Sequence, residues 1–209
     1  MEPLLQGVTW LGHASFRIVG ESVIYIDPWQ LEGGPQADLI LVTHGHHDHL
    51  SPEDIKRISG PTTVVLCPPD CVSEIPAGQA RAVRPGDQLQ VAGVSIEVVP
   101  AYNRDKPNHP RSAGHVGYIV TTGGRRIYHA RDTDLIPEMD RIQCDVALLP
   151  MGGTYTMDAE QAAQAAARIR PQIVVPMHWG RLVGTQRDVD RLKSLMPEGV
   201  RLVTMVPES

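Results

Sequence analysis

The sequence predicts a mixed α/β or α+β domain, and two observations support that prediction. Short apolar runs of strand type fill the first half of the 209-residue chain, each bounded by Gly, Pro or Asp. In the second half, strand-type runs alternate with segments of helical type. Mixed strands with helices outside them favour a four-layer αβ/βα sandwich, with residues 1–209 forming a single domain.

The first half of the chain is expected to consist mainly of strands. They are 8–11, 15–19, 23–27, 39–43, 63–66, 88–91 and 94–99. One short helix interrupts them. It begins at Ser51, which suits the N-cap, because Pro52 fits the first helical position and a carboxylate follows at the third. Residues 55–58 continue this helix.

The second half is expected to alternate strands with two longer helices. The strands are 116–120, 126–129, 146–149, 173–175 and 201–206, and the helices are 158–169 and 186–196. Asp158 places a capping side chain at the positive end of the first of these helices. The alanines that follow Asp158 suit close packing onto a sheet.

Composition narrows the class of protein. The net charge is −5, which argues against general nucleic-acid binding, where a basic surface is expected. No apolar run has the length of a membrane span, and the first residues lack the features of a signal peptide. The cysteines Cys67, Cys71 and Cys144 are odd in number and form no CxxC pair, which fits reduced thiols in a cytoplasmic protein.

A run of histidines directly after an apolar strand-type segment is the strongest functional feature. Residues 43–50 read Thr-His-Gly-His-His-Asp-His-Leu and supply His44, His46, Asp48 and His49. Alternation in an extended segment would point the first three of these side chains the same way, and a turn would bring in His49. Imidazole and carboxylate together suit zinc, manganese or iron at a hydrolytic centre. A histidine-rich surface loop is the alternative, and so complete a ligand pattern rarely arises by chance.

This pattern resembles the signature of the metallo-β-lactamase-fold hydrolases. Further similar segments occur in the family's order at 25–28, 128–134 and 176–180. The segments 10–13, which reads Trp-Leu-Gly-His, and 149–157 resemble a branch of small stand-alone members. Together these segments span most of the chain, and the resemblance implies the four-layer sandwich and a metal-dependent hydrolase.

The resemblance also implies a dinuclear site with two divalent ions, zinc in first place and manganese or iron as alternatives. His44 and His46 would bind the first ion, and Asp48 and His49 the second. His178 would complete the second site, and Asp132 would bridge the two ions. A hydroxide bridging the ions would be the nucleophile, and Asp48 could also accept a proton from the attacking water.

The remaining ligand of the first site is open, because tyrosine and asparagine stand at 102–103, where the family usually has a histidine. His109 is the favoured candidate, His115 is the second, and neither is the third possibility. A further departure from the family is Arg131, where glycine is usual before the bridging aspartate. Either the backbone there does not need a positive φ, or the site is distorted.

Several neighbours are expected around the metals. Asp27 is the leading candidate to accept the second ring N–H of a ligating histidine. His13 and His129 either border the pocket or are hydrogen-bonded core histidines. Thr154 and Tyr155 either contact substrate or pack against the protein. His47 is expected to point away.

The resemblance leaves the substrate undefined, since the fold hosts many activities. We expect cleavage of an ester-type bond, as in a lactone, phosphoester or thioester, in a small molecule. Cationic side chains near the expected ligand loops, if they are not merely solvated, would favour an anionic substrate. They are Arg104, Lys106, Arg111, Arg131 and Arg181. The alternatives are a di-iron redox protein working with a separate flavoprotein, or a catalytically weak metal-binding module. Association into a homo-oligomer is left open.

Overall fold

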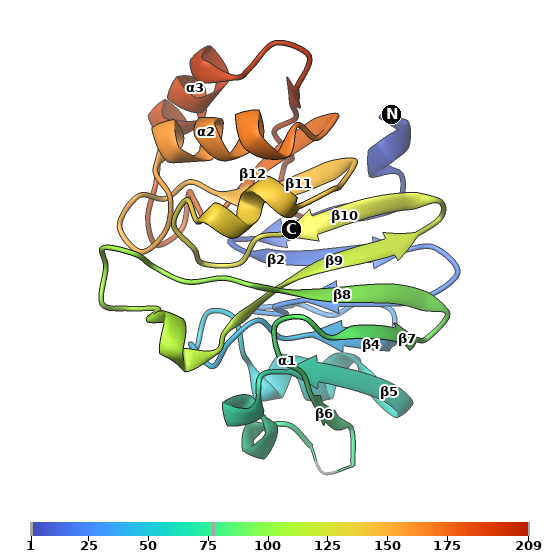
Figure 1. Ribbon diagram of the computed structural model, residues 1–209. Coiled ribbons are helices and arrows are strands. Elements are labelled where there is room, and N and C mark those ends of the chain that lie inside the picture. The colour runs from blue at the N-terminus through green and yellow to red at the C-terminus, as the bar shows by residue number, and fades with distance from the viewer. Residues whose placement is uncertain (1, 77, 209) are drawn as a thin grey trace.

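Two β-sheets stack face to face, and helices cover the outer face of each sheet (Figure 1). The computed structural model describes residues 2–76 and 78–208. The first sheet contains β1 to β6 in chain order, and the second has the order β13-β12-β11-β10-β9-β8-β7. The four-layer sandwich expected from the sequence is therefore confirmed.

The first sheet begins as an antiparallel meander and continues with parallel strands. Its strands are β1 (Val8–Gly12), β2 (Ser15–Val19), β3 (Val23–Ile26), β4 (Ala37–Leu41), β5 (Ser59–Cys67) and β6 (Ala80–Ala82). Two details differ from the sequence prediction. Strand β5 starts at Ser59, before the expected residue 63, and β6 was not expected. The three-residue Ala-Arg-Ala sequence of β6 contains no β-branched or aromatic residue, and its pairing with β5 alone defines it as a strand.

The second sheet is antiparallel from β7 to β10 and parallel from β10 to β13. Its strands are β7 (Gln88–Val91), β8 (Val94–Pro100), β9 (Val116–Thr122), β10 (Arg125–His129), β11 (Val146–Pro150), β12 (Ile173–Met177) and β13 (Arg201–Leu202). The expected strand 201–206 was too long, since only its first two residues pair with β12. The other strands lie within about three residues of their expected bounds.

The helices begin where the capping residues predict. They are α1 (Pro52–Ile58), α2 (Ala159–Ile169) and α3 (Gln186–Leu195). The Ser51 hydroxyl accepts a hydrogen bond from the backbone N–H of Asp54, and Asp158 caps α2 through the N–H of Gln161. Short 3₁₀ helices were not expected and occur at η1 (Pro3–Leu5), η2 (Pro69–Glu74), η3 (Arg111–Ala113) and η4 (Pro137–Arg141).

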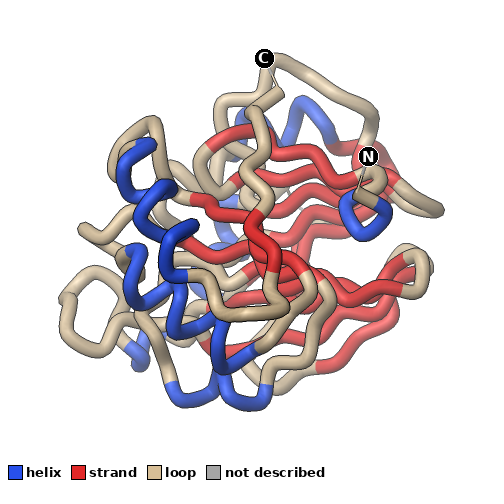
Figure 2. The backbone as a smooth tube through the Cα atoms, turned by 90° about the horizontal axis from the view of Figure 1, so that it is seen from above, coloured by secondary structure: helices blue, strands red, loops and turns tan. Residues whose placement is uncertain are grey.

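Three apolar clusters hold the layers together. One lies between the two sheets and includes Phe16, Tyr118 and Val175. The second joins the outer face of the second sheet to α2, whose buried alanines allow close approach, and to α3. The third joins the first sheet to α1. Seen from above, helices lie across the layer of strands (Figure 2). No helix among residues 2–76 and 78–208 is long and apolar enough to cross a membrane.

The polar residues expected in the site follow the ends of strands from both sheets. His13 follows β1, Asp27 follows β3, and His44 follows β4, all in the first sheet. From the second sheet, Asp132 follows β10 and His178 follows β12. The sandwich therefore brings side chains that are distant in sequence to one edge, on loops supported by buried strands.

Candidate metal centre

One group of ligand-type side chains consists of three histidines, His44, His46 and His109. One ring nitrogen from each lies within 4.8 Å of the other two. Nδ1 of His46 is 3.1 Å from Nε2 of His44 and 3.2 Å from Nε2 of His109. His109 comes from the loop after β8, so the structure places it, rather than His115, beside the first two histidines. We call this group the first cluster.

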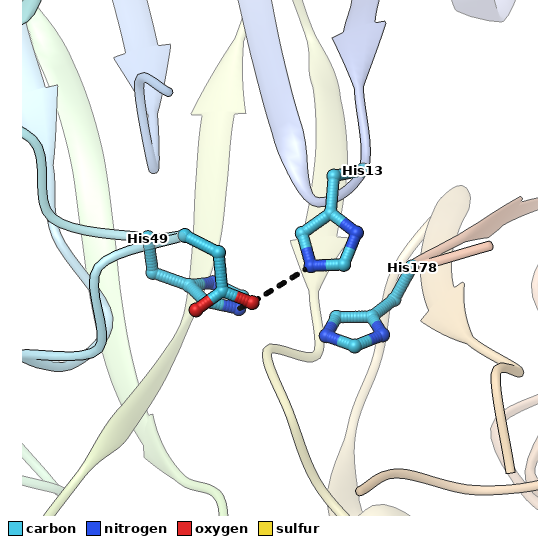
Figure 3. Close-up of side chains that lie close together, drawn as sticks. His13, His49 and His178 are labelled. Carbon is cyan, nitrogen blue, oxygen red and sulfur yellow. Dashed lines mark hydrogen bonds and ion pairs between the residues drawn. The ribbon is translucent and has the colours of Figure 1, made fainter. Parts of the chain in front are cut away.

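A second group contains His13, Asp48, His49 and His178, whose ligand atoms also lie within 4.8 Å of one another. The rings of His13, His49 and His178 converge from three separate parts of the chain (Figure 3). Nε2 of His13 is 3.0 Å from Oδ2 of Asp48, and the His13 and His178 ring centroids are 3.9 Å apart. We call this group the second cluster. It includes His13, which the sequence suggested only as a neighbour.

Asp132 lies between the two clusters. Its Oδ1 is 3.3 Å from Nε2 of His49. Its Oδ2 is 3.1 Å from Nε2 of His178 in the second cluster and 3.7 Å from Nε2 of His109 in the first. Asp132 could therefore contact a cation held by either cluster.

The residues of the centre fit bound divalent cations. Nε2 of His49, both ring nitrogens of His178 and Oδ1 of Asp132 are buried and have no hydrogen-bond partner among the described residues. Leaving such groups unsatisfied is costly, and a metal ion would use them as ligands. Burial opposes ionisation of Asp132, but His178 and His49 hold its pKa well below the usual range. The carboxylate is therefore ionised and available to a cation.

Hydrogen bonds behind the ligands fix which ring nitrogen faces the cavity. Asp27 accepts from the backbone N–H of Thr43, from the Thr43 hydroxyl and, at 2.7 Å, from Nδ1 of His49. Nε2 of His49 therefore faces Asp132. The Asn103 side-chain oxygen lies 2.8 Å from Nδ1 of His109 and orients that ring in the same way, with Nε2 toward the centre. The role expected for Asp27 agrees with this geometry. The partner roles of Thr43 and Asn103 were not expected.

The loop after β4 contains the expected turn, but the turn begins at His46, so the segment is not extended as far as Asp48. The strand ends at Leu41, and the N–H groups of His49 and Leu50 both bond to the carbonyl of His46, so the chain turns there. Because of this turn, Asp48 and His49 both face the centre although they are adjacent in sequence. His47 is exposed and belongs to neither cluster, but it does not point fully away, because it lines the cavity that opens onto the centre.

Arg131 adopts a left-handed backbone conformation with φ of 66°. The first alternative offered for Arg131, a backbone that does not need a positive φ, is therefore wrong. Its side chain is buried and donates to the carbonyls of Ala101 and Asp132 and to Nδ1 of His115. His115 is thereby engaged at one ring nitrogen and does not join either cluster.

A cavity of about 450 Å³ opens onto the centre. The residues that line it are His46, His47, Asp48, Asn108, His109, Asp132, Tyr155 and Leu182. Thr154 is exposed and is not among them, and His129 is buried with Nε2 bonded to the Ala14 carbonyl. The position of His129 agrees with the core alternative, whereas Thr154, exposed and outside the cavity, fits neither of its two alternatives. Tyr155 does line the cavity.

None of the cationic side chains expected near the site lines this cavity, although Arg131 is buried beside the centre. Lys106 pairs with Asp134, and Arg111 pairs with Glu138. Arg181 bonds to Gln30 and lines a separate cavity. Among the residues that line the 450 Å³ cavity there is no lysine or arginine.

The two candidate histidines can be separated by substitution. Loss of a residue that supports a metal ligand weakens metal binding by roughly 10–100-fold. His109→Ala removes a direct ligand, so it should weaken metal binding at the first cluster by at least that factor. His115→Ala should retain wild-type metal affinity. Competition with a chromophoric chelator measures both variants. Wild-type retention by both would exclude His109 as a ligand.

The sandwich and its histidine-aspartate centre define a metal-dependent hydrolase of the metallo-β-lactamase fold. Residues 7–178 match the family model described as a beta-lactamase superfamily domain, and the chain belongs to that superfamily. A UPF0173 metal-dependent hydrolase from Pyrococcus abyssi is 35% identical, with 96% of each chain covered. A Parabacteroides distasonis protein of known crystal structure is 33% identical, with a TM-score of 0.85 over 95% of this chain and 91% of that one. Igni18, a metallo hydrolase from Ignicoccus hospitalis, is 27% identical, with a TM-score of 0.77 over 97% and 95%.

Proposed function

We propose that this hydrolase holds two divalent ions and cleaves an ester-type bond of a small molecule, as in a lactone, phosphoester or thioester. Zinc is the first choice of metal, and manganese or iron are alternatives. The observation that supports this most strongly is the position of Asp132. Its carboxylate lies within 3.7 Å of imidazole nitrogens from both clusters. Bound ions would satisfy the buried atoms that have no other partner.

When bound, two divalent ions acidify a water molecule and polarise the bond to be cleaved. Asp48 is the residue that can move the proton. It lines the cavity with 8% of its surface exposed, and His13 holds its Oδ2 at 3.0 Å. Burial opposes ionisation, but the His13 hydrogen bond and the charge of His49 keep the pKa of Asp48 well below its usual value. Asp48 is thus ionised, and its Oδ1 can accept a proton from the attacking water and pass it to the leaving group.

The side chains at the rim of the cavity favour a substrate with an apolar portion. The large exposed apolar side chains of the described residues are Val19, Tyr155, Leu182 and Val206. Tyr155 and Leu182 both lie on this cavity, 41% and 51% exposed. Because its lining lacks lysine and arginine, an anionic group of a substrate would have to be bound by the metal ions.

The proposal is tested first by metal content. His44→Ala and His46→Ala should each lower the content of zinc-loaded protein from two ions per chain to one, because each removes a ligand of the first cluster only. Elemental analysis of the purified variants measures this. His47→Ala, in the same loop but outside both clusters, is the matched control and should keep both ions.

Hydrolysis is tested on a panel of lactones, thioesters and phosphodiesters. We expect at least one class to be cleaved, with activity lost on chelation and restored by zinc or manganese. Unchanged metal content in both histidine variants, or hydrolysis that survives complete metal removal, would refute the proposal.

A further inference from the structure

Arg131 places a positive charge inside the protein, directly before Asp132. It is 0% exposed and is the largest of the fully buried side chains. Its guanidinium donates only to neutral groups, namely two backbone carbonyls and a ring nitrogen of His115, and its Nε has no partner among the described residues. Burial lowers the pKa of Arg131 to about 10, so the group still carries its charge at neutral pH.

This charge lies on the side of the first cluster. His115, which contacts Arg131, has its ring centroid 5.3 Å from that of His44 and 6.2 Å from that of His109. The ring centroid of His115 is also 6.4 Å from that of His46, so all three first-cluster histidines lie around the ring that Arg131 contacts.

The balance of buried charge also matters. Asp27, Asp48 and Asp132 bring three carboxylates to the centre, and their histidine partners bind metal as neutral imidazoles. The guanidinium of Arg131 cancels one of the three negative charges. The two that remain balance a single divalent ion, so a second ion, even with a hydroxide between the two, would add net positive charge beside a buried cation.

We propose that Arg131 makes the two metal sites unequal. One ion is held tightly by the second cluster and Asp132, and the other is held weakly and exchangeably by the first cluster. This inference rests on the proposed two-ion function. It assigns Arg131 the role of setting metal affinity through its charge, without ligating a metal or touching substrate.

A purely structural role for Arg131 leads to the opposite expectation. The side chain ties together the backbone at Ala101 and Asp132 on two of the loops that carry the centre. If that support were its only role, every replacement would disorder the loops and weaken metal binding. If its charge dominates, a neutral side chain of similar length strengthens binding at the first cluster.

The first experiment uses the wild-type protein. Zinc titration of metal-free protein against a chromophoric chelator should show two steps that differ in affinity by about tenfold or more. His46→Ala should lose the weak step and keep the tight one. Two equal steps, or loss of the tight step in His46→Ala, would overturn the inference. Uptake of a single ion in excess zinc by both proteins would instead contradict the two-ion function itself.

The second experiment assigns the cause. Arg131→Met should tighten the weak step by about tenfold or more, whereas Arg131→Lys, which keeps the charge, should stay within a few-fold of wild type. Circular dichroism verifies that each variant is folded. If the methionine variant does not fold, Arg131→Gln, which can still donate to a carbonyl, takes its place. Unchanged or weaker binding in the folded neutral variant overturns the inference.

Discussion

Replacement of Asp132 by alanine should reduce hydrolysis by several orders of magnitude while the protein remains folded. Asp132 is the only carboxylate among the described residues placed within 3.7 Å of nitrogens from His49, His109 and His178. In the proposed two-ion centre, its removal would expose the two cations to each other's repulsion and leave the attacking water unpositioned. The fold should survive because the residue lies on a loop after β10 and contributes no apolar contact to the core.

The measurement is kcat/KM for the best ester in the panel, together with metal content and circular dichroism. Asp105→Ala removes an exposed carboxylate from a neighbouring loop and should leave all three unchanged. If Asp132→Ala keeps both ions and more than about a tenth of the activity, Asp132 does not bridge the ions. A tenfold loss of activity corresponds to only about 1.4 kcal/mol of transition-state stabilisation.

Replacement of Asp27 by alanine should have the largest effect on stability. The Asp27 carboxylate accepts from two groups of Thr43 and from Nδ1 of His49, and all of these are buried. Removal leaves the Thr43 backbone N–H and Nδ1 of His49 without an acceptor, and His49 without its orientation. We expect a loss of about 3–5 kcal/mol in the free energy of unfolding, together with weaker metal binding.

Urea denaturation of metal-free protein measures the effect without the contribution of bound metal. Asp38→Ala is the control, because Asp38 also accepts a backbone N–H, that of Val23, but at the surface. It should cost less than about 1 kcal/mol. A cost of similar size for Asp27→Ala would mean that the Asp27 network does not support the centre.

The fold was predictable from the sequence where apolar runs form buried strands. Strands such as β4 and β11 are buried almost throughout, and their composition alone identifies them. Strand β6 could not be predicted, because Ala80–Ala82 is a strand only through its pairing with the edge of β5. The length of the last strand, β13, was overestimated for a related reason, because apolar residues continue beyond the point where its pairing with β12 ends.

The candidate site was predictable where its residues form a short motif. The run from His44 to His49 supplied ligands for both clusters, and the resemblance supplied Asp132 and His178. The placement of His13 in the second cluster depends on the left-handed turn after β1, with φ of 51°, and on packing against His178. Neither can be read from one segment of sequence.

Charge near the site illustrates the same limit. Proximity in sequence suggested cations that bind an anionic substrate. The structure pairs Lys106 and Arg111 with acidic side chains and buries Arg131 behind the first cluster. Side-chain direction decides whether a charge faces a cavity, and that direction is set by tertiary contacts.

The most direct test of the two-ion centre is anomalous diffraction at the zinc absorption edge from crystals grown in excess zinc. The geometry predicts two peaks, one bounded by the histidines of the first cluster and one by the side chains of the second cluster, with Asp132 contacting both. Saturating zinc fills the weaker site as well, so inequality between the sites does not affect this result. No peak at these residues, or a single peak bound by only one cluster, would contradict the account.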